Sequence, residues 1–185
     1  FYYGVIYTMW LKRATPQNIV IGGGAGAFPP VIGWAAVTGN TPLDAWILFA
    51  IIFFWTPPHF WALSLLAHKE YAKVSVPMLP VTHGAKVTRS QILVYTLVLV
   101  PVSLLPLATG LGGWIYGGVA LGLGAVFLSY ALRLLRSNAG DASASGADMK
   151  LAKTTFVFSI LYLFALFGAV LVEHAAGLHF PLTGL

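Results

Sequence analysis

A basic pair stands between two apolar stretches in "YTMWLKRATPQN", residues 7–18. Lys12 and Arg13 could clamp an anionic group, because both side chains donate charged hydrogen bonds to phosphate. Asn18 closes the segment, and we include it among the candidate substrate-binding residues. A basic pair is also an ordinary anchor at a membrane surface. Considered alone, these residues leave both interpretations open.

A histidine interrupts a second apolar stretch, "WTPPHFWALSL", residues 55–65. Proline removes helix hydrogen bonds and histidine in hydrocarbon lacks water, so both need a reason to be there. Trp55 lies one helical turn before His59 and gives it an aromatic wall. A hydrogen-bonded packing role is the plainer interpretation of His59. The functional one is a metal ligand, and haem iron is a common partner of histidine.

A carboxylate follows in "AHKEYAK", residues 67–73. Glu70 stands eleven residues after His59 and shares its face if the helix continues that far. A carboxylate among basic side chains suits Mg²⁺ that is shared with a substrate phosphate. A solvated Glu/Lys surface is the alternative. The two prolines of "VPMLPV" (76–81) predict a loop that folds over the site. The candidates beside Glu70 are Lys69, Tyr71 and Lys73.

The elements that position these residues are membrane helices. Of the 185 residues, 58% are hydrophobic and 8% charged, and the mean hydropathy is +0.84. Soluble domains carry about 25% charged residues. The chain has no cysteine, which excludes disulfides, thiolate metal sites and a cysteine nucleophile. A membrane span needs about 20 apolar residues, and in lipid it must be helical or part of a closed barrel.

Charge-free windows predict five complete spans after a partial one at 1–11. We therefore expect an all-α polytopic transmembrane helix bundle, with 1–185 as one membrane domain. The chain begins without an initiator methionine, and we expect it to be the C-terminal part of a longer protein. Residues 137–150, rich in small polar side chains, predict a flexible cytoplasmic linker. The predicted spans are 18–38, 43–67, 91–109, 114–134 and 154–172.

Threading these spans brings all ten Lys and Arg residues to one face. The opposite face carries Asp44 and Glu173 but no basic residue. The positive-inside rule makes the basic face cytoplasmic. This distribution also explains the net charge of +5 without nucleic acid as a partner.

Two long motifs carry a resemblance to a known family. "YTMWLKRATPQNIVIGGGAGAFPPVIGWAAVTG" (7–39) and "FFWTPPHFWALSLLAHKEYAKVSVPMLPVTHG" (53–84) closely resemble the haem O synthase (protohaem IX farnesyltransferase) family, within the UbiA superfamily of intramembrane prenyltransferases. The resemblance covers the whole chain. It implies the C-terminal part of a UbiA-type bundle in a bacterial cytoplasmic (inner) membrane. The implied reaction joins the farnesyl group of farnesyl diphosphate to haem B, giving haem O and diphosphate at the cytoplasmic side.

The resemblance also implies roles for the candidate residues. Lys12 and Arg13 would stabilise the departing diphosphate, and Glu70 would hold Mg²⁺, the expected cofactor. His59 is our candidate for orienting haem through its iron, which is an inference from the residue and not a family assignment. The expected apolar wall of the pocket is Trp55, Phe60 and Trp61. The expected partners besides the lipid bilayer are haem A synthase or a terminal oxidase assembly.

Two departures from the family pattern stand out. The superfamily's first acidic motif is absent, so we expect this chain alone to be inactive. Glu70-Tyr71 replaces the usual Asp-Tyr, which keeps the carboxylate but lengthens it by one methylene. The alternatives are a prenyltransferase for a quinone precursor or chlorophyllide, a non-catalytic subunit that holds haem, and a transporter or channel.

Overall fold

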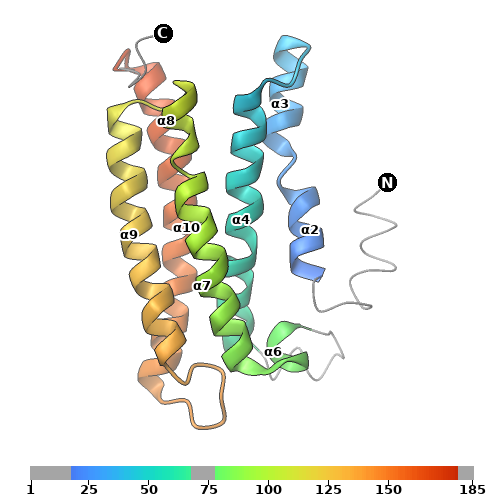
Figure 1. The fold of residues 1–185 in the computed structure, drawn as a ribbon, viewed down its shortest axis with the longest axis vertical. Coiled ribbons are helices and arrows are strands. Elements are labelled where there is room, and N and C mark those ends of the chain that lie inside the picture. Colours follow the sequence, from blue (N-terminus) through green and yellow to red (C-terminus); the bar gives the residue numbers. More distant parts are fainter. Residues whose placement is uncertain (1–17, 68–77, 179–185) are drawn as a thin grey trace.

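The computed structural model describes residues 18–67 and 78–178, and every regular element in these ranges is a helix. The long helices stand side by side as a bundle (Figure 1). This confirms the expected all-α membrane fold. The predicted partial span at 1–11 lies outside the described residues. The candidate membrane spans are Asn18–Thr38, Leu43–Leu66, Gly84–Thr109, Trp114–Arg136 and Gly146–Ala175.

The first span is two helices and not the single helix that we predicted. α2 (Asn18–Gly26) and α3 (Pro29–Thr38) are separated at Ala27 and Phe28. The physical reason is the proline pair that opens α3. Pro29 and Pro30 have no N–H to donate to the carbonyls of the preceding turn, so α2 cannot continue through them, but both fit the first turn of a new helix, where a missing N–H has no partner in any case.

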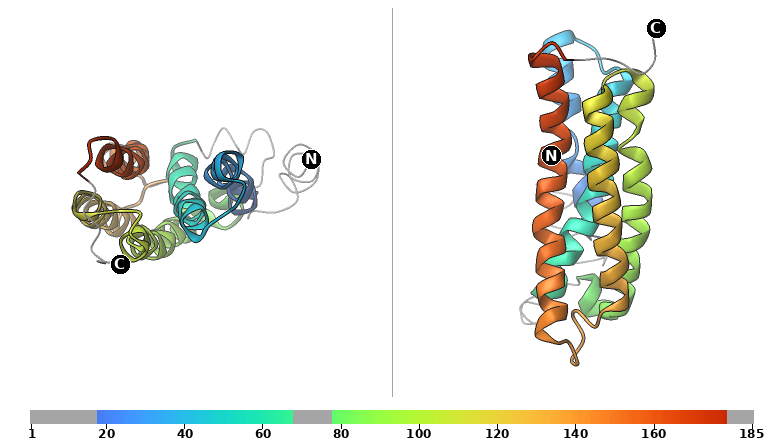
Figure 2. Two further views of the ribbon diagram at one scale, coloured as in Figure 1. Left: turned by 90° about the horizontal axis from the view of Figure 1, so that it is seen from above. Right: turned by 90° about the vertical axis from the view of Figure 1, so that its left-hand side faces the viewer.

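α4 (Leu43–Leu66) is the central helix of the bundle. It packs against α2, α3, α7 (Gly84–Val102) and α10 (Gly146–Ala175). Figure 2 shows it between the α2–α3 pair on one side and the remaining long helices on the other. α4 stays helical through both of its buried prolines, 57 and 58. A short helix, α6 (Leu79–Thr82), lies within the segment predicted as a loop, with its proline in the first turn.

The third span begins earlier than predicted and contains a break. It consists of α7 and α8 (Leu105–Thr109), and its first residue is Gly84 instead of 91. Charge-free windows miss this start because Lys86 and Arg89 lie in its first two turns. At the break, the Ser103 carbonyl accepts a hydrogen bond from the Tyr116 hydroxyl at 2.7 Å, and the Ser103 hydroxyl lies 2.7 Å from that of Tyr162. These tyrosines satisfy polar groups that lipid cannot.

α9 (Trp114–Arg136) agrees with prediction, whereas α10 starts eight residues before the predicted 154. The predicted linker 137–150 is therefore shorter, because its last five residues belong to α10. The cause is a capping box: the Ser145 hydroxyl accepts from the Asp148 N–H, and the Asp148 carboxylate accepts from the Ser145 N–H. At 1.5 Å per residue, α10 is about 45 Å long, so its charged first turns extend beyond a hydrocarbon core of about 30 Å.

The rest of this linker is packed against the bundle. Arg89, 4% exposed, donates to the Ala139 carbonyl at 2.6 Å and to the Asp141 carboxylate at 2.9 Å. Ala139 is fully buried. Gly140 has a φ of 86° and lies against the side chains of Leu65 and Ala85, where a Cβ would come within 2.9 Å of each. Small residues in this loop therefore serve close packing.

Charge separates the two ends of the bundle. Within the described ranges, the basic residues lie near the start of α7, the end of α9 and the start of α10, which meet at one end in Figure 1. We call this the basic end. The other end carries Asp44 and the buried Glu173, and the described residues place no Lys or Arg there. The residues at the basic end are Lys86, Arg89, Arg133, Arg136, Lys150 and Lys153.

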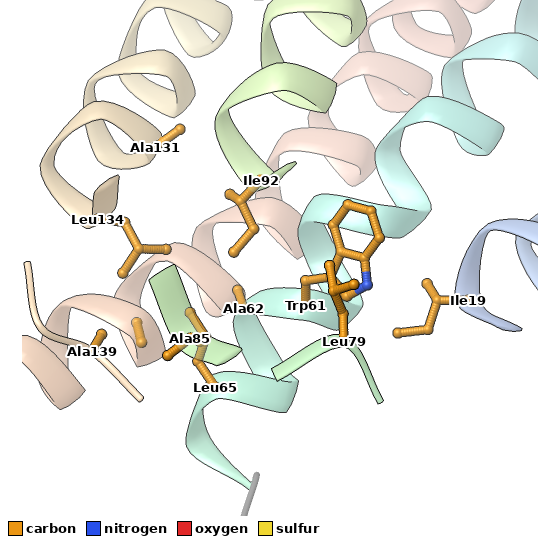
Figure 3. Close-up of a cluster of buried hydrophobic side chains, with 11 residues drawn as sticks. Ile19, Trp61, Ala62, Leu65, Leu79, Ala85, Ile92, Ala131, Leu134 and Ala139 are labelled. Atoms are coloured by element: carbon orange, nitrogen blue, oxygen red, sulfur yellow. The ribbon is translucent and has the colours of Figure 1, made fainter. Parts of the chain in front are cut away.

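Two clusters of buried apolar side chains fill the bundle. The one drawn in Figure 3 joins α2, α4, α6, α7, α9 and the 137–145 loop at the basic end, with Trp61 and Leu65 of α4 at its centre. The second cluster joins α4, α7, α9 and α10 nearer the other end and includes Phe127 and Tyr162. α4, α7, α9 and α10, the last through Ala152 in the first cluster, contribute to both clusters, so these four long helices are packed together along their length.

Candidate functional site

The predicted site residues divide into two groups. One group lies outside the ranges that the structure describes. Its members are Lys12, Arg13, Lys69, Glu70, Tyr71 and Lys73. The other group lies at the start of α2 and in the second half of α4; its members are Asn18, Trp55, His59, Phe60 and Trp61.

His59 is held between two aromatic rings. The indole of Trp55, one turn earlier on α4, stacks on one side with centroids 4.3 Å apart and an interplanar angle of 18°. The ring of Phe156 on α10 stacks at 4.7 Å and 26°. His59 is 8% exposed and lies seven residues before the end of α4, roughly 10 Å along the helix axis. With its flat faces covered, the imidazole can meet a ligand only through its edge.

Ser159 on α10 connects to both α4 residues. Its hydroxyl oxygen lies 2.7 Å from Nδ1 of His59, and its backbone carbonyl accepts a hydrogen bond from Nε1 of Trp55 at 2.7 Å. The Nε2 atom of His59 has no hydrogen bond to any residue that the structure describes. Trp55, His59, Phe156 and Ser159 therefore form one unit, which we call the His59 cluster.

Phe60 and Trp61 point in different directions from His59. Phe60 is 42% exposed, and its ring is nearly perpendicular to that of His59 (81°), with ring centroids 5.0 Å apart. Trp61 is 1% exposed and lies about 200° around α4 from His59. It packs edge-to-face on Tyr95 at 5.2 Å and belongs to the cluster in Figure 3. Of the two, only Phe60 shares the surroundings of His59, and Trp61 serves the core.

Asn18 is the first residue of α2 and is 2% exposed. The next residue, Ile19, packs in the same cluster as Trp61. The described structure thus places Asn18 beside the core at the basic end. The sequence predicts that Glu70 shares a helix face with His59 if the helix continues that far. α4 ends at Leu66, so that argument from helical spacing does not hold.

An apolar groove runs beside the His59 cluster between α4 and α10. One cavity of about 310 Å³ is lined by Trp55, and a wider one of about 580 Å³ continues toward the Asp44 end. Phe167 lines both. The groove could hold a flexible hydrocarbon chain. The other residues of the smaller cavity are Ile52, Ile160, Leu163 and Phe164.

Sequence reasoning missed two members of the His59 cluster. Ser159 and Phe156 lie in the apolar window 154–172, which we treated as a plain span. The only available signal was a hydroxyl residue within a run of apolar ones, and such residues commonly satisfy their own helix backbone. Their contact with α4, about 100 residues away in the chain, follows from tertiary packing.

No metal cluster is found within 18–67 and 78–178: these ranges bring together no group of three or more His, Asp or Glu side chains. The described residues therefore do not fit a magnesium site by themselves. The carboxylate that we predicted for magnesium, Glu70, lies outside them. A magnesium site is thus a prediction about the segment around Glu70.

The pattern of apolar helices agrees with the comparison to known proteins. The sequence pattern of the UbiA prenyltransferase family matches residues 1–154, most of the chain. The chain belongs to the UbiA prenyltransferase family. The UbiA match includes the segments of both Lys12 and His59, and it ends within α10.

Individual UbiA relatives are also similar over the whole chain. A protein named protoheme IX farnesyltransferase from Hyphomonas neptunium is 88% identical over 184 residues, which are 100% of this chain and 58% of the relative. Proteins of the same name from Caulobacter sp. and Maricaulis maris are 56% and 55% identical, over 96% and 100% of the chain. The chain spans 57–58% of the length of these relatives. No solved structure matches.

Proposed function

We propose that the complete protein is a protohaem IX farnesyltransferase, which converts haem B, farnesyl diphosphate and water to haem O and diphosphate. The observation that carries this proposal is the 88% identity, along the whole chain, to a relative of that name. The UbiA family supplies the reaction class, prenyl transfer within the membrane. The buried His59 with its free ring edge supports haem as the acceptor.

The proposed reaction adds a farnesyl group and a hydroxyl group across one vinyl double bond of haem B. The allylic C–O bond of farnesyl diphosphate breaks, and its electron pair leaves with the diphosphate. The vinyl π electrons of haem B attack the allylic cation and form the new C–C bond. Water adds to the resulting cation next to the pyrrole ring and loses a proton. Cationic donors aimed at the leaving group lower the barrier to the first step.

We assign the diphosphate end to the residues before α2 and after α4. Lys12 and Arg13 would neutralise the leaving group, and Lys69, Tyr71 and Lys73 would contact the substrate. Magnesium, when bound at Glu70, would add positive charge to the same diphosphate. The roles of all these residues are proposals from the sequence.

We assign the haem end to the His59 cluster. Iron is bound in the plane of an imidazole ring, so a ligand role needs the ring edge and leaves the faces free for packing. The stacking of Trp55 and Phe156 on His59 is compatible with that requirement. The apolar groove beside Trp55 would accept the farnesyl chain. The aromatic faces near it could also stabilise the allylic cation.

We place the active site at the basic end and infer that this end faces the cytoplasm of a bacterium, in its inner membrane. The diphosphate group of farnesyl diphosphate is charged and hydrophilic, so it must enter the site from an aqueous side of the membrane. Haem A synthase or a terminal oxidase assembly would receive the product.

The test is product formation by the complete gene. It is expressed in a bacterial host deleted for its own haem O synthase, and the membrane haems are separated by reverse-phase chromatography and weighed by mass spectrometry. A late-eluting haem that is heavier than haem B by one farnesyl and one hydroxyl group would support both reaction and acceptor. Haem B alone, with the protein folded in the membrane, would contradict the proposal and favour a quinone-type prenyltransferase or a haem-holding subunit.

A further inference from the structure

The hydroxyl of Ser159 makes two short contacts but has only one hydrogen. It lies 2.5 Å from the Phe156 carbonyl, three residues earlier on α10, and 2.7 Å from Nδ1 of His59. Ser159 is fully buried, so within the described structure these are its side-chain partners. The serine proton can lie in only one of these two contacts. Which contact contains it determines which ring nitrogen of His59 carries a proton.

The serine proton must lie in the contact with the Phe156 carbonyl. Two oxygens at 2.5 Å repel unless a hydrogen lies between them, and a carbonyl has none to give. The serine proton therefore points to Phe156, and the serine oxygen accepts. At the 2.7 Å contact the histidine must then be the donor, through an N–H on Nδ1. A neutral imidazole carries a single N–H, so Nε2 keeps its lone pair.

We propose that Ser159 is a positioning residue that holds His59 as the Nδ1–H tautomer and so presents the Nε2 lone pair to a Lewis acid or a proton donor. The stacked rings of Trp55 and Phe156 fix the plane of the imidazole, and the serine fixes its rotation and proton. Nε2 has no partner among the described residues. The identification of this Lewis acid as the iron of haem B rests on the proposed function, whereas the tautomer of His59 is inferred independently of it.

The contacts of Ser159 allow a selective test. Trp55 is bound to the backbone carbonyl of Ser159, so Ser159→Ala removes the contact to His59 and leaves the one to Trp55. Ser64 offers a matched control. It is also buried, at 1% exposed, and donates to the carbonyl three residues earlier at 2.9 Å, but the structure gives it no histidine contact.

The experiment measures the tautomer directly in the complete, haem-free protein, purified in detergent and labelled with ¹⁵N-histidine. The ring nitrogens of His59 are assigned by their loss in His59→Gln. In the unsubstituted protein we expect a protonated Nδ1 and an unprotonated Nε2. In Ser159→Ala we expect the Nε2–H form to appear, and in Ser64→Ala no change. A protonated Nε2 in the unsubstituted protein, or an unchanged spectrum in Ser159→Ala, would overturn the proposal.

Haem titration separates this proposal from the proposed function. Loss of a side chain that hydrogen-bonds to a metal ligand typically weakens metal binding by about 10- to 100-fold. We expect that weakening for ferric haem in Ser159→Ala, together with a shifted Soret band, and recovery to within a few-fold in Ser159→Thr. If His59→Gln leaves the haem spectrum unchanged, iron ligation is wrong, while the nitrogen shifts still decide the role of Ser159.

Discussion

His59 shows how a polar side chain can be tolerated within a membrane span. Its ring faces are covered by Trp55 and Phe156, and Nδ1 is hydrogen-bonded to Ser159. These contacts reduce the penalty of burying the imidazole, because a buried polar group is costly mainly when it lacks a partner. The same contacts leave one nitrogen available, so packing and ligand binding are compatible at this residue.

Substitutions at the two ends of the proposed site should separate its substrates. We expect His59→Ala to weaken haem binding by more than about tenfold, because the iron loses a ligand, with the affinity for farnesyl diphosphate largely kept. Lys12→Ala and Glu70→Gln should do the reverse. A charged hydrogen bond is worth about 1.5–3 kcal/mol, or about 10- to 100-fold in affinity.

The measurement is separate binding titrations of haem and of a non-hydrolysable farnesyl diphosphate analogue to the complete protein. Val126→Ala, at a 40% exposed position of α9 that lines neither cavity, is the control and should change neither affinity. Equal, small effects of all three site substitutions would contradict the assignment.

Glu173 is a second buried polar residue, and its role is structural. Its carboxylate accepts hydrogen bonds from the N–H groups of Gly113, Ile115 and Tyr116 at 2.8, 2.8 and 3.0 Å. These N–H groups lie at the start of α9, where a helix leaves its first donors without partners and favours negative charge. Glu173, at the end of α10, therefore caps the neighbouring helix.

We expect Glu173→Ala to lower the free energy of unfolding by about 3 kcal/mol, because buried donors lose a charged acceptor. Glu173→Gln should cost less, since its amide oxygen can still accept. Thermal unfolding of the complete protein in detergent measures both. Val172→Ala, at the 54% exposed neighbouring position, is the control and should change stability by less than about 1 kcal/mol. A Glu173→Ala protein as stable as this control would refute the capping role.

At the scale of elements, Gly23 of α2 packs directly against Thr56 of α4. A Cβ there would lie 2.9 Å from the Thr56 methyl carbon, which is tighter than real contacts allow. The glycine-rich run "GGGAGA" (22–27) that contains it thus serves helix packing, as small residues commonly do in membranes. Gly33 in α3 has nothing within 4 Å of its Cβ position and offers a matched comparison.

Gly23→Ala should therefore destabilise the protein by about 1–2 kcal/mol through overpacking. Gly33→Ala should be neutral or slightly stabilising, since alanine favours a helix. Thermal unfolding of each variant checks the difference. Thr56→Ser removes the methyl group that clashes, so it should recover most of the stability of Gly23→Ala. If the double variant is no more stable than Gly23→Ala, close α2–α4 packing is not the cause.

At the scale of the whole molecule, charge gives the bundle a direction. The described basic residues gather at one end, with Asp44 and Glu173 at the other. Basic residues flank cytoplasmic ends because their translocation is disfavoured. The two ends should therefore differ in their access to a reagent that cannot cross the membrane.

The absence of cysteine from these 185 residues makes labelling straightforward. Thr41→Cys, in the exposed α3–α4 turn, should react with an impermeant maleimide in intact spheroplasts. Ser143→Cys, exposed in the α9–α10 loop, should react only after permeabilisation. Val157→Cys, on the apolar surface of α10, is the control and should react in neither case. The opposite order for Thr41 and Ser143 would invert the topology.

Chain length, apolarity and the positions of charges were sufficient to predict an all-helical membrane bundle with five spans. In lipid only a helix or a closed barrel satisfies the backbone hydrogen bonds, and apolar windows of about 20 residues have the length of a helical span and not of a barrel strand. The same local information singled out Trp55 and His59, because a histidine and two prolines are costly in a span. Helix ends were less accurate: charge-free windows missed the charged first turns of α7 and α10.

Contacts between distant segments could not be predicted in this way. The apolar run 154–172 contains no pattern that predicts Ser159 as the partner of His59. The sequence near Gly113 likewise does not predict that Glu173 of α10 caps the start of α9. Apolar burial is non-directional, so it requires that helices associate but does not say which faces meet. Side-chain packing and the need to pair each buried polar atom make that choice, and both exist only once the helices are assembled.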